Sequence, residues 1–323
     1  MDSVPLDPTL PQEELVSAKA ESKRHLTARQ REGIWFYIII SPWLVGLLLL
    51  LAGPMVYSIY LSFTNWDLFN APEWVGLDNY VRLFTRDRTF GTALGNTFYY
   101  TLLYVPLNIV LSLAIAWLLN KPLRGMRFFR TVIYLPYVVP VVATTMVFRW
   151  VFAPDNGLLN GFMSIFGIDG PAWLLDPAWT KLALVIMSLW GVGASVVFLL
   201  AGMQGIPPEL YEAASIDGAT ERHRFFRITL PMLSPIIFFN MIMSIIASLQ
   251  TFTQIYILNT DPNTPSNSIM MVIPYLFDNA FKFNKMGYAS AIAWVLFVFI
   301  FVFTLLIIRW SSAWVFYESE MKR

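Results

Sequence analysis

The sequence predicts an all-α membrane protein with six transmembrane helices. Hydrophobic residues make up 57% of the 323 residues and charged residues only 13%, whereas a globular domain carries about 25% charge. Six segments of at least 18 residues contain no Asp, Glu, Lys or Arg, and a helix needs roughly 20 apolar residues to cross a bilayer. This composition excludes a soluble enzyme, a disulfide-stapled secreted domain and a disordered chain. The charge-free segments are residues 33–66, 89–120, 131–148, 182–208, 228–260 and 286–308.

The polar segment before the first apolar segment lacks the apolar core of a signal peptide, so the first helix is expected to stay in the membrane. The expected organisation is a cytoplasmic N-terminal tail of residues 1–33, a six-span membrane domain of residues 34–310 and a cytoplasmic C-terminal tail of residues 311–323. Within the membrane domain, the helices are expected at residues 34–60, 95–119, 131–153, 181–203, 230–257 and 287–308.

The distribution of Lys and Arg predicts the orientation, because cytoplasmic loops carry an excess of these residues. With the N-terminus in the cytoplasm, the inner segments contain fifteen Lys and Arg residues and the outer loops contain five. The opposite orientation would invert this three-to-one bias. Both termini are therefore expected in the cytoplasm.

The last cytoplasmic loop, residues 204–229, is predicted to contain a short helix. Pro208, which follows another proline, suits the first helical position because its missing N–H costs nothing there. Glu209 and Glu212 place negative charge in the first turn, where the helix dipole favours it. Gly218 suits a left-handed cap at the C-terminus.

A helix of about ten residues is not stable alone in water, so this one needs a docking surface. Ala213 and Ala214 leave a narrow face that could enter a groove on another protein. A second helical segment is expected from about Thr220, with Phe225 and Ile228 on one face, and leads into the next span.

Seven residues of this region match the EAA loop of ABC importer permeases, in which Glu-Ala-Ala is followed at fixed spacing by Gly, Ile, Leu and Pro. They are Glu212, Ala213, Ala214, Gly218, Ile228, Leu230 and Pro231. The fuller segment 210–219, Leu-Tyr-Glu-Ala-Ala-Ser-Ile-Asp-Gly-Ala, resembles the carbohydrate-importer branch of the binding-protein-dependent permeases. Over about residues 35–310 the chain is similar to the first permease subunit of the maltose-transporter type, in a six-span form.

The resemblance implies the type I ABC importer permease fold and a half-channel for a mono- or oligosaccharide that works by alternating access. It implies four kinds of partner in a bacterial or archaeal cytoplasmic membrane: the lipid bilayer, a second homologous permease, two cytoplasmic ATP-binding subunits and an extracytoplasmic solute-binding protein. The helix of residues 208–218 would be the coupling helix that contacts an ATP-binding subunit. The alternative is a loop that only caps its neighbouring helices. The expected coupling residues are Leu210, Tyr211, Glu212, Ala213, Ala214, Asp217 and Gly218.

No catalysis is expected of this chain. It contains no G-x-x-x-x-G-K-[ST] phosphate loop, so ATP and Mg would be bound by the partner subunits and the chain itself would need no cofactor. With no cysteine and with its two histidines, His25 and His223, in separate polar segments, no catalytic or metal site is predicted. The formal net charge of +1 gives no reason to expect nucleic-acid binding.

Five polar residues of the fifth predicted span fall within about 120° of arc on a helix and form one stripe. Polar groups in a bilayer interior often line a pathway, and hydroxyls and amides can hydrogen-bond to sugar hydroxyls. Such residues also serve as contacts between helices. Both interpretations are open from the sequence. The stripe consists of Asn240, Ser244, Ser248, Thr251 and Gln254.

Small residues in the fourth predicted span are interpreted as points of close helix approach; they include Gly191, Gly193 and Gly202.

Two other functions compete with sugar import. An ABC permease for a non-sugar solute such as glycerol-3-phosphate is opposed only by the resemblance to the carbohydrate branch. A secondary transporter that works alone is opposed by the EAA loop and by the lack of Asp or Glu within the predicted membrane spans.

Overall fold

The computed structural model describes residues 27–259, 266–311, 314 and 315. The chain divides into two units, residues 1–58 and residues 59–323. Most of the two predicted tails, residues 1–33 and 311–323, lies outside the described residues, as does His25.

The described part of the first unit is an apolar helix. Thr27 caps its start, because the Thr27 side chain accepts a hydrogen bond from the Gln30 backbone N–H and the Gln30 side chain accepts one from the Thr27 backbone N–H. The helix therefore begins several residues before the predicted span. Its segments are α2 (Ala28–Gly46), the π-helical η1 (Leu47–Ala52) and α3 (Gly53–Ser62), which runs into the second unit.

The second unit is built from helices and one small antiparallel sheet, in which Thr64 pairs with Trp74 and Asn65 with Glu73. In chain order its elements are β1 (Thr64–Asn65), β2 (Glu73–Trp74), α4 (Asp78–Thr85), α5 (Arg88–Leu119), α6 (Met126–Val138), α7 (Val141–Val151), α8 (Leu158–Ile165), α9 (Pro177–Leu189), α10 (Gly193–Gln204), α11 (Pro208–Ile216), α12 (Glu221–Arg224), η2 (Phe225–Thr229), α13 (Leu230–Leu249), α14 (Thr253–Asn259), α15 (Ser266–Ile269), α16 (Val272–Phe277), η3 (Asp278–Lys282) and α17 (Met286–Ser311).

Among the described residues, four helical segments are long and apolar enough to cross a membrane: Arg29–Ser62, Arg88–Leu119, Glu221–Asn259 and Met286–Ser311. Two pairs of shorter helices meet the same requirement together. The pair α6 and α7 is bent by 97°, and the pair α9 and α10 is bent by 49°. If each bent pair is one span, the described residues contain the six spans that the sequence predicts.

The third and fourth predicted spans, residues 131–153 and 181–203, are not continuous helices. The third breaks at Val139, whose backbone is extended because the residue before a proline avoids the helical region, and Pro140 follows it. The fourth breaks at residues 190–192. The fifth predicted span, residues 230–257, is also interrupted, since α13 ends at Leu249 and α14 begins at Thr253.

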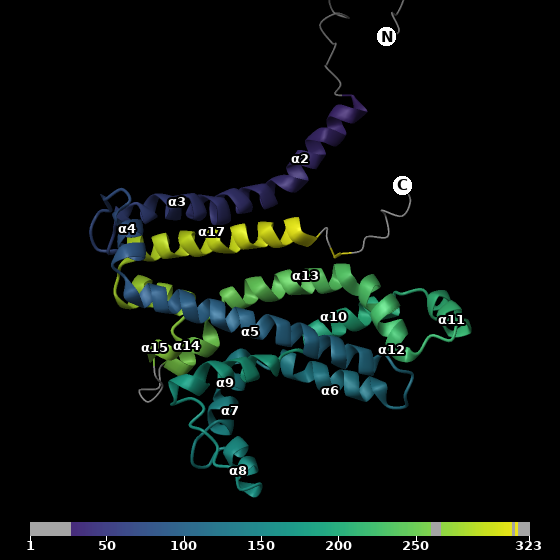
Figure 1. Cartoon of the computed structure of the whole chain (residues 1–323). Helices are drawn as coiled ribbons and strands as arrows, with labels where there is room; N and C mark the ends of the chain where they lie inside the picture. Colours follow the sequence, from purple (N-terminus) through teal and green to yellow (C-terminus); the bar gives the residue numbers. More distant parts are fainter. Residues whose placement is uncertain (1–26, 260–265, 312–313, 316–323) are drawn as a thin grey trace, which may run out of the picture. The chain divides into compact units, whose positions relative to one another are not determined.

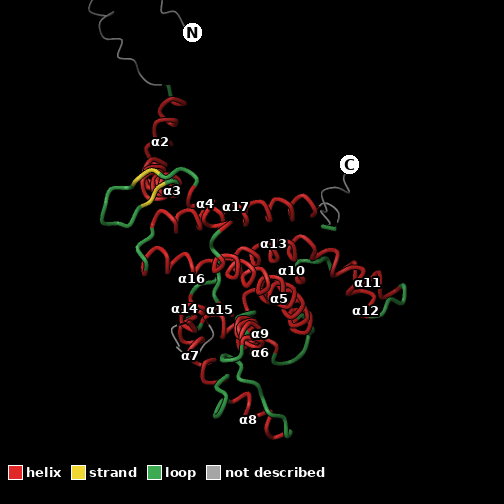
Figure 2. The backbone as a smooth tube through the Cα atoms, turned by 60° about the vertical axis from the view of Figure 1, so that its left-hand side comes forward, coloured by secondary structure: helices red, strands yellow, loops and turns green. Residues whose placement is uncertain are grey.

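The long helix α5 forms the centre of the second unit and packs against α9, α10 and α13. Figures 1 and 2 both show α10 and α13 running alongside α5, with α11 and α12 at one end of this bundle and α14 and α15 at the other. We refer to these as the α11 end and the α15 end.

Close helix approach is confirmed at two of the glycines that the sequence singled out. A Cβ atom on Gly193 would lie within 3 Å of the α6 backbone at Ile133, and one on Gly202 would overlap the side chain of Ile236 on α13. Any larger residue at Gly193 would therefore push α10 away from α6.

Candidate functional site

The short helix predicted in the loop of residues 204–229 is present as α11. Pro208 is its first residue and Glu209 lies in its first turn, whereas Glu212, which was also expected in the first turn, lies beyond it. The chain leaves the helix through Gly218, which has a φ of +76°. The Ala219 N–H donates to the Ala214 carbonyl at 2.9 Å and the Gly218 N–H donates to the Ser215 carbonyl at 3.1 Å. This is the Schellman pattern that a left-handed glycine permits, so the predicted start and end of the helix are confirmed.

The second predicted helical segment is also present. The Thr220 side chain caps α12 by accepting a hydrogen bond from the His223 N–H at 3.3 Å. From there α12 continues through η2 into α13 without interruption. Phe225 and Ile228 pack against an apolar cluster at the α11 end that includes Leu199 of α10 and Leu233 of α13.

One face of α11 is fixed to the segment that follows it. The Tyr211 hydroxyl and the Thr229 hydroxyl form a hydrogen bond of 2.9 Å. The Arg224 guanidinium donates to the Ser215 hydroxyl at 2.9 Å, and that hydroxyl donates to the backbone carbonyl of Tyr211. The helix is therefore held in place by its own chain, as a helix of nine residues requires.

The opposite face of α11 is exposed. Ile216 at the C-terminal end of the helix is 87% exposed, and Leu210 at the other end is 41% exposed. Of the predicted coupling residues, Tyr211 and Ala214 are half-buried, while Leu210, Glu212, Ala213, Asp217 and Gly218 are exposed. Most of the predicted coupling residues therefore lie on a surface that no other part of the described chain covers.

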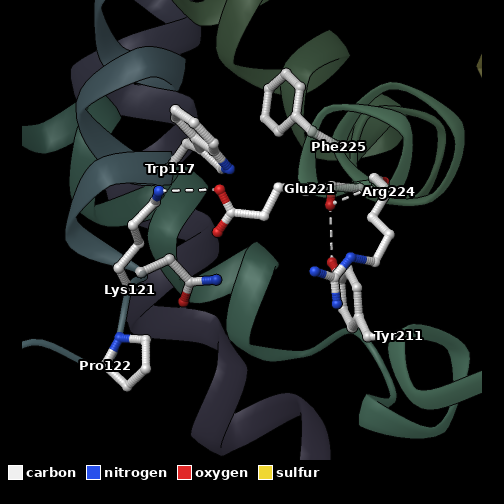
Figure 3. A pocket seen from close by; sticks show the side chains of 9 residues that line it. Trp117, Lys121, Pro122, Tyr211, Glu221, Arg224 and Phe225 are labelled. Atoms are coloured by element: carbon white, nitrogen blue, oxygen red, sulfur yellow. Dashed lines mark hydrogen bonds and ion pairs between the residues drawn. The ribbon is translucent and has the colours of Figure 1, made fainter. Parts of the chain in front are cut away.

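A pocket of about 230 Å³ lies between the end of α5 and this loop (Figure 3). Lys121, just beyond α5, and Glu221 on α12 point toward one another across it, and Lys121 Nζ lies 3.2 Å from Glu221 Oε2. The same ammonium group lies 4.5 Å from the centre of the Trp117 ring, and that ring meets the Phe225 ring edge-on at 5.5 Å. The full lining is Trp117, Asn120, Lys121, Pro122, Tyr211, Glu221, Arg224, Phe225 and Thr229.

Three residues of the predicted polar stripe are buried within the bundle. The Asn240 side-chain oxygen accepts from the hydroxyls of Ser195 on α10, at 3.2 Å, and Ser244, at 3.3 Å. Asn108 on α5 donates to both of those serines, at 3.3 and 3.1 Å. Ser248 donates to the Thr101 hydroxyl of α5 at 3.0 Å. These contacts join α5, α10 and α13 and are those expected of interhelical packing.

The other two residues of the stripe lie beyond the end of α13. Thr251 is in the break between α13 and α14, Gln254 is in the first turn of α14, and both are half-buried. The interruption places both residues outside the continuous helix on which the stripe was based. The structure therefore separates the five residues into a buried group of three and a group of two at the break.

The helices on either side of the three breaks pack against one another. The start of α10 touches the α6 backbone at Gly193, the ring of Phe148 on α7 lies 5.9 Å from the ring of Trp190, and α14 packs against α7. Trp190 and Tyr137, both at breaks, are each 55% exposed. Sequence reasoning missed these two aromatic residues. Pro136 and Pro140 on either side of Tyr137 were the available signal for the first break.

A polar cluster near the start of α5 joins that helix to α16 and α17. The Tyr275 and Tyr288 hydroxyls both donate to the Asp87 carboxylate, at 2.5 Å each, and the other carboxylate oxygen caps α5 by accepting from the Phe90 N–H. Burial raises the pKa of Asp87, but these hydrogen bonds outweigh it and lower the pKa below its ordinary value. Burial and the hydrogen bond to Asp87 raise the pKa of Tyr275 to about 12.

Among the residues that the structure describes, no group of three or more His, Cys, Asp or Glu side chains is placed to hold a metal ion. The features that stand out are the exposed helix α11, the pocket behind it and the three helix breaks.

Residues 108–315 match the model of a family described as the binding-protein-dependent transport system inner membrane component. The chain belongs to this family. A probable ABC transporter permease of Bacillus subtilis, YesP, is 40% identical over 303 residues, which cover 93% of this chain and 98% of YesP. The arabinooligosaccharides transport system permease AraP of Halalkalibacterium halodurans is 33% identical over 289 residues, which cover 88% of this chain and 90% of AraP.

A solved structure gives the same result for the fold. It is a bacterial ABC transporter involved in the import of the acidic polysaccharide alginate, and one of its chains is similar to this permease with a TM-score of 0.74 and 25% identity. The match covers 88% of this chain and 96% of that chain. The predictions of the type I importer permease fold, of a multi-pass membrane protein and of a permease that is not itself an enzyme are confirmed. In this family ATP hydrolysis is done by separate subunits.

Proposed function

We propose that this permease forms half of the pathway of an ATP-driven importer that carries a mono- or oligosaccharide across the cytoplasmic membrane of a bacterium or archaeon by alternating access. The observation that carries the proposal is the geometry of α11. One face of this helix is held to its own chain through Tyr211 and Ser215, and the other face presents Leu210, Glu212 and Ile216 to solvent. A rigid element with an open face can pass a displacement from another subunit into the membrane domain.

The proposed partners follow from the family. A second homologous permease completes the pathway, two cytoplasmic ATP-binding subunits bind ATP and Mg, and an extracytoplasmic protein delivers the solute. The solved alginate transporter was obtained in complex with an alginate pentasaccharide-bound periplasmic protein, which supports the last of these. In this arrangement α11 and both chain termini face the cytoplasm, which is supported by the excess of Lys and Arg in the loops at that side.

A carbohydrate is the solute that the relatives favour. Besides the arabinooligosaccharides permease, they include the lactose permease LacF of Rhizobium radiobacter, 33% identical over 276 residues, and the trehalose/maltose permease MalF of Thermococcus litoralis, 32% identical over 285 residues. Glycerol-3-phosphate remains the alternative solute.

The three helix breaks support a position for the solute path. Non-helical backbone at membrane depth is tolerated only where protein buries it or where it lines a water-filled cavity, because lipid cannot satisfy its polar groups. We therefore place the path beside the breaks, with Tyr137, Trp190, Thr251 and Gln254 at its wall. The buried group Asn240, Ser244 and Ser248 would hold the helices behind that wall.

The test is reconstitution. The chain is purified with its co-expressed second permease and ATP-binding subunits, placed in proteoliposomes with the cognate binding protein, and supplied with labelled lactose, maltose, trehalose, arabinooligosaccharides or glycerol-3-phosphate. We expect ATP-dependent uptake of at least one sugar, no uptake without the binding protein and no uptake by this chain alone.

Each contrary result removes a defined part of the proposal. Uptake of glycerol-3-phosphate but of no sugar would replace the solute. Uptake by the isolated chain would replace the mechanism with that of a secondary transporter.

A direct test of α11 uses Ile216→Cys, which needs no altered background because the chain has no cysteine. Failure of this residue to cross-link to an ATP-binding subunit in the assembled transporter would contradict the coupling role.

A further inference from the structure

The loop that carries α11 is joined covalently only to α10 and α13. The chain turns at Pro207 before α11 and at Gly218 after it, and neither turn is part of a helix. A displacement of α11 that travelled along the backbone alone would have to pass through one of these turns. The hydrogen bonds from Tyr211 and Arg224 bypass the second turn, because they fix α11 directly to η2 and α12.

A contact between distant parts of the sequence also connects this loop to a third helix, α5. Glu221 on α12 forms an ion pair with Lys121, which follows the C-terminal cap of α5. The pair spans 100 positions of sequence. Next to it, the Trp117 ring on α5 meets the Phe225 ring at 5.5 Å. Figure 3 shows these four side chains arranged around one pocket, two of them from the end of α5 and two from the segment after α11.

We propose that Lys121 and Glu221 are positioning residues that make the end of α5 part of the coupling unit, so that α11, α12 and α5 move as one body when the ATP-binding subunits close. This inference rests on the proposed coupling function of α11. It adds a polar contact between the loop that carries α11 and the end of α5, a helix that already packs against α10 and α13.

The pair is placed to position rather than to stabilise. The side chains of Lys121 and Glu221 are 31% and 62% exposed, and ion pairs with this exposure contribute little to the free energy of unfolding. Lys121 is nevertheless held in one place by the Trp117 ring beneath its ammonium group. Its charge also lies at the C-terminal end of α5, where the helix dipole favours a cation. An oriented cation at a helix end is suited to hold Glu221 at a fixed position.

The helix that would receive the displacement leads directly to the helix breaks. Tyr100 on α5 donates to Ser188 at the end of α9, Thr101 accepts from Ser248 at the end of α13, and Asn108 donates to Ser195 on α10. A shift of α5 therefore acts on α9, α10 and α13, the helices next to the second and third breaks. The ion pair would give the ATP-binding subunits a direct connection to all of these contacts.

The experiment measures whether α11 and α5 move together. Spin labels are placed at Glu209→Cys, an exposed position in the first turn of α11, and at Leu118→Cys on the exposed side of α5, where Leu118 is 53% exposed. The distance between them is measured in the full transporter in nanodiscs, without nucleotide and after trapping with ATP and vanadate. The variants are Glu221→Lys, Lys121→Glu and the double swap. Arg124→Glu, an exposed charge reversal in the same loop as Lys121, is the matched control.

With the Lys121–Glu221 ion pair intact, and also in Arg124→Glu, we expect one narrow distance between the labels. That distance should be the same with and without trapping. In each single charge reversal, we expect a second population of molecules with a different distance between the labels. The ratio of the original population to this second population should fall by about fivefold, which corresponds to about 1 kcal/mol, the upper end for an exposed ion pair. The swap should restore the distance, and the number of ATP molecules hydrolysed per solute transported should follow the same order.

Single reversals that leave the trapped distance unchanged, or a swap that restores nothing, would overturn the inference. The proposed coupling function is read separately, from the cross-link between Ile216→Cys and an ATP-binding subunit. If that cross-link forms while the reversals have no effect, only the role of the ion pair is wrong. If it does not form, the coupling function itself is wrong, whatever the distances show.

Discussion

The substitution Asn240→Ala distinguishes the two roles open to the polar stripe on α13. In the structure, the Asn240 amide oxygen accepts from Ser195 of the neighbouring helix α10 at 3.2 Å and from Ser244 at 3.3 Å, and the residue is 7% exposed. If the stripe holds helices together, removal of the amide should destabilise the bundle and leave solute recognition intact.

The magnitude follows from two contributions. A hydrogen bond between helices in a membrane protein is worth about 0.6 kcal/mol on average. The void left by an amide group of about 25 Å³ adds about 0.6 kcal/mol at roughly 24 cal/mol per Å³. The expected loss is therefore about 1 kcal/mol in the free energy of unfolding, or about a fivefold change in the unfolding equilibrium.

The assay combines unfolding of the purified chain by SDS in mixed micelles with the sugar concentration dependence of uptake in proteoliposomes. Gln254→Ala, beyond the end of α13, is the comparison, and here we expect unchanged stability and a raised apparent KM for sugar. The reasoning is refuted if Asn240→Ala leaves the unfolding midpoint unchanged and raises the apparent KM instead.

Four further outcomes are expected. Gly218→Ala should reduce uptake per ATP hydrolysed, because a side chain in the left-handed region costs about 1–2 kcal/mol and would shift the end of α11; unchanged coupling would contradict this. Glu212→Lys should likewise uncouple hydrolysis from uptake while the purified chain unfolds at an unchanged SDS concentration, because Glu212 is exposed. Ile216→Ala should weaken co-purification of the ATP-binding subunits without altering the unfolding of this chain, since the residue is 87% exposed. The folded-state pKa of Asp87 lies below its ordinary value of 3.8, so the carboxylate stabilises the fold above that pH and this contribution is lost as the pH falls through the folded-state pKa. Tyr275→Phe, which removes one hydrogen bond that lowers this pKa, should flatten the acid dependence of unfolding measured between about pH 5 and pH 2.

Several features of the candidate site could be read from short stretches of sequence. The start of α11 at Pro208 and its end before Gly218 follow from backbone preferences of single residues, since proline fixes φ and glycine tolerates a left-handed backbone. The Thr220 cap of α12 is equally local. Such signals act within one helical turn, so they need no information about the rest of the fold.

The helix breaks show where local signals become insufficient. Pro140 marks the first break, but a proline within a span is also compatible with a mild kink, and the bend of 97° depends on where α7 packs. The break after Leu249 has no glycine or proline at residues 250–252. It occurs where α14 turns to pack against α7. Because the predicted stripe assumed an unbroken helix, spacing alone did not show that its last two residues, Thr251 and Gln254, lie at a break and in the next helix.

The sequence by itself determined that this protein is a bundle of membrane-spanning helices with a short exposed helix in one loop, because a long charge-free segment and a capped turn are each decided by neighbouring residues. Only the tertiary structure decided which polar residues face other helices and which lie at a break. It alone brought Lys121 to Glu221, since the contact depends on α5 ending close to where α12 begins. Contacts between distant segments follow from the packing of whole helices, and no local pattern records that packing.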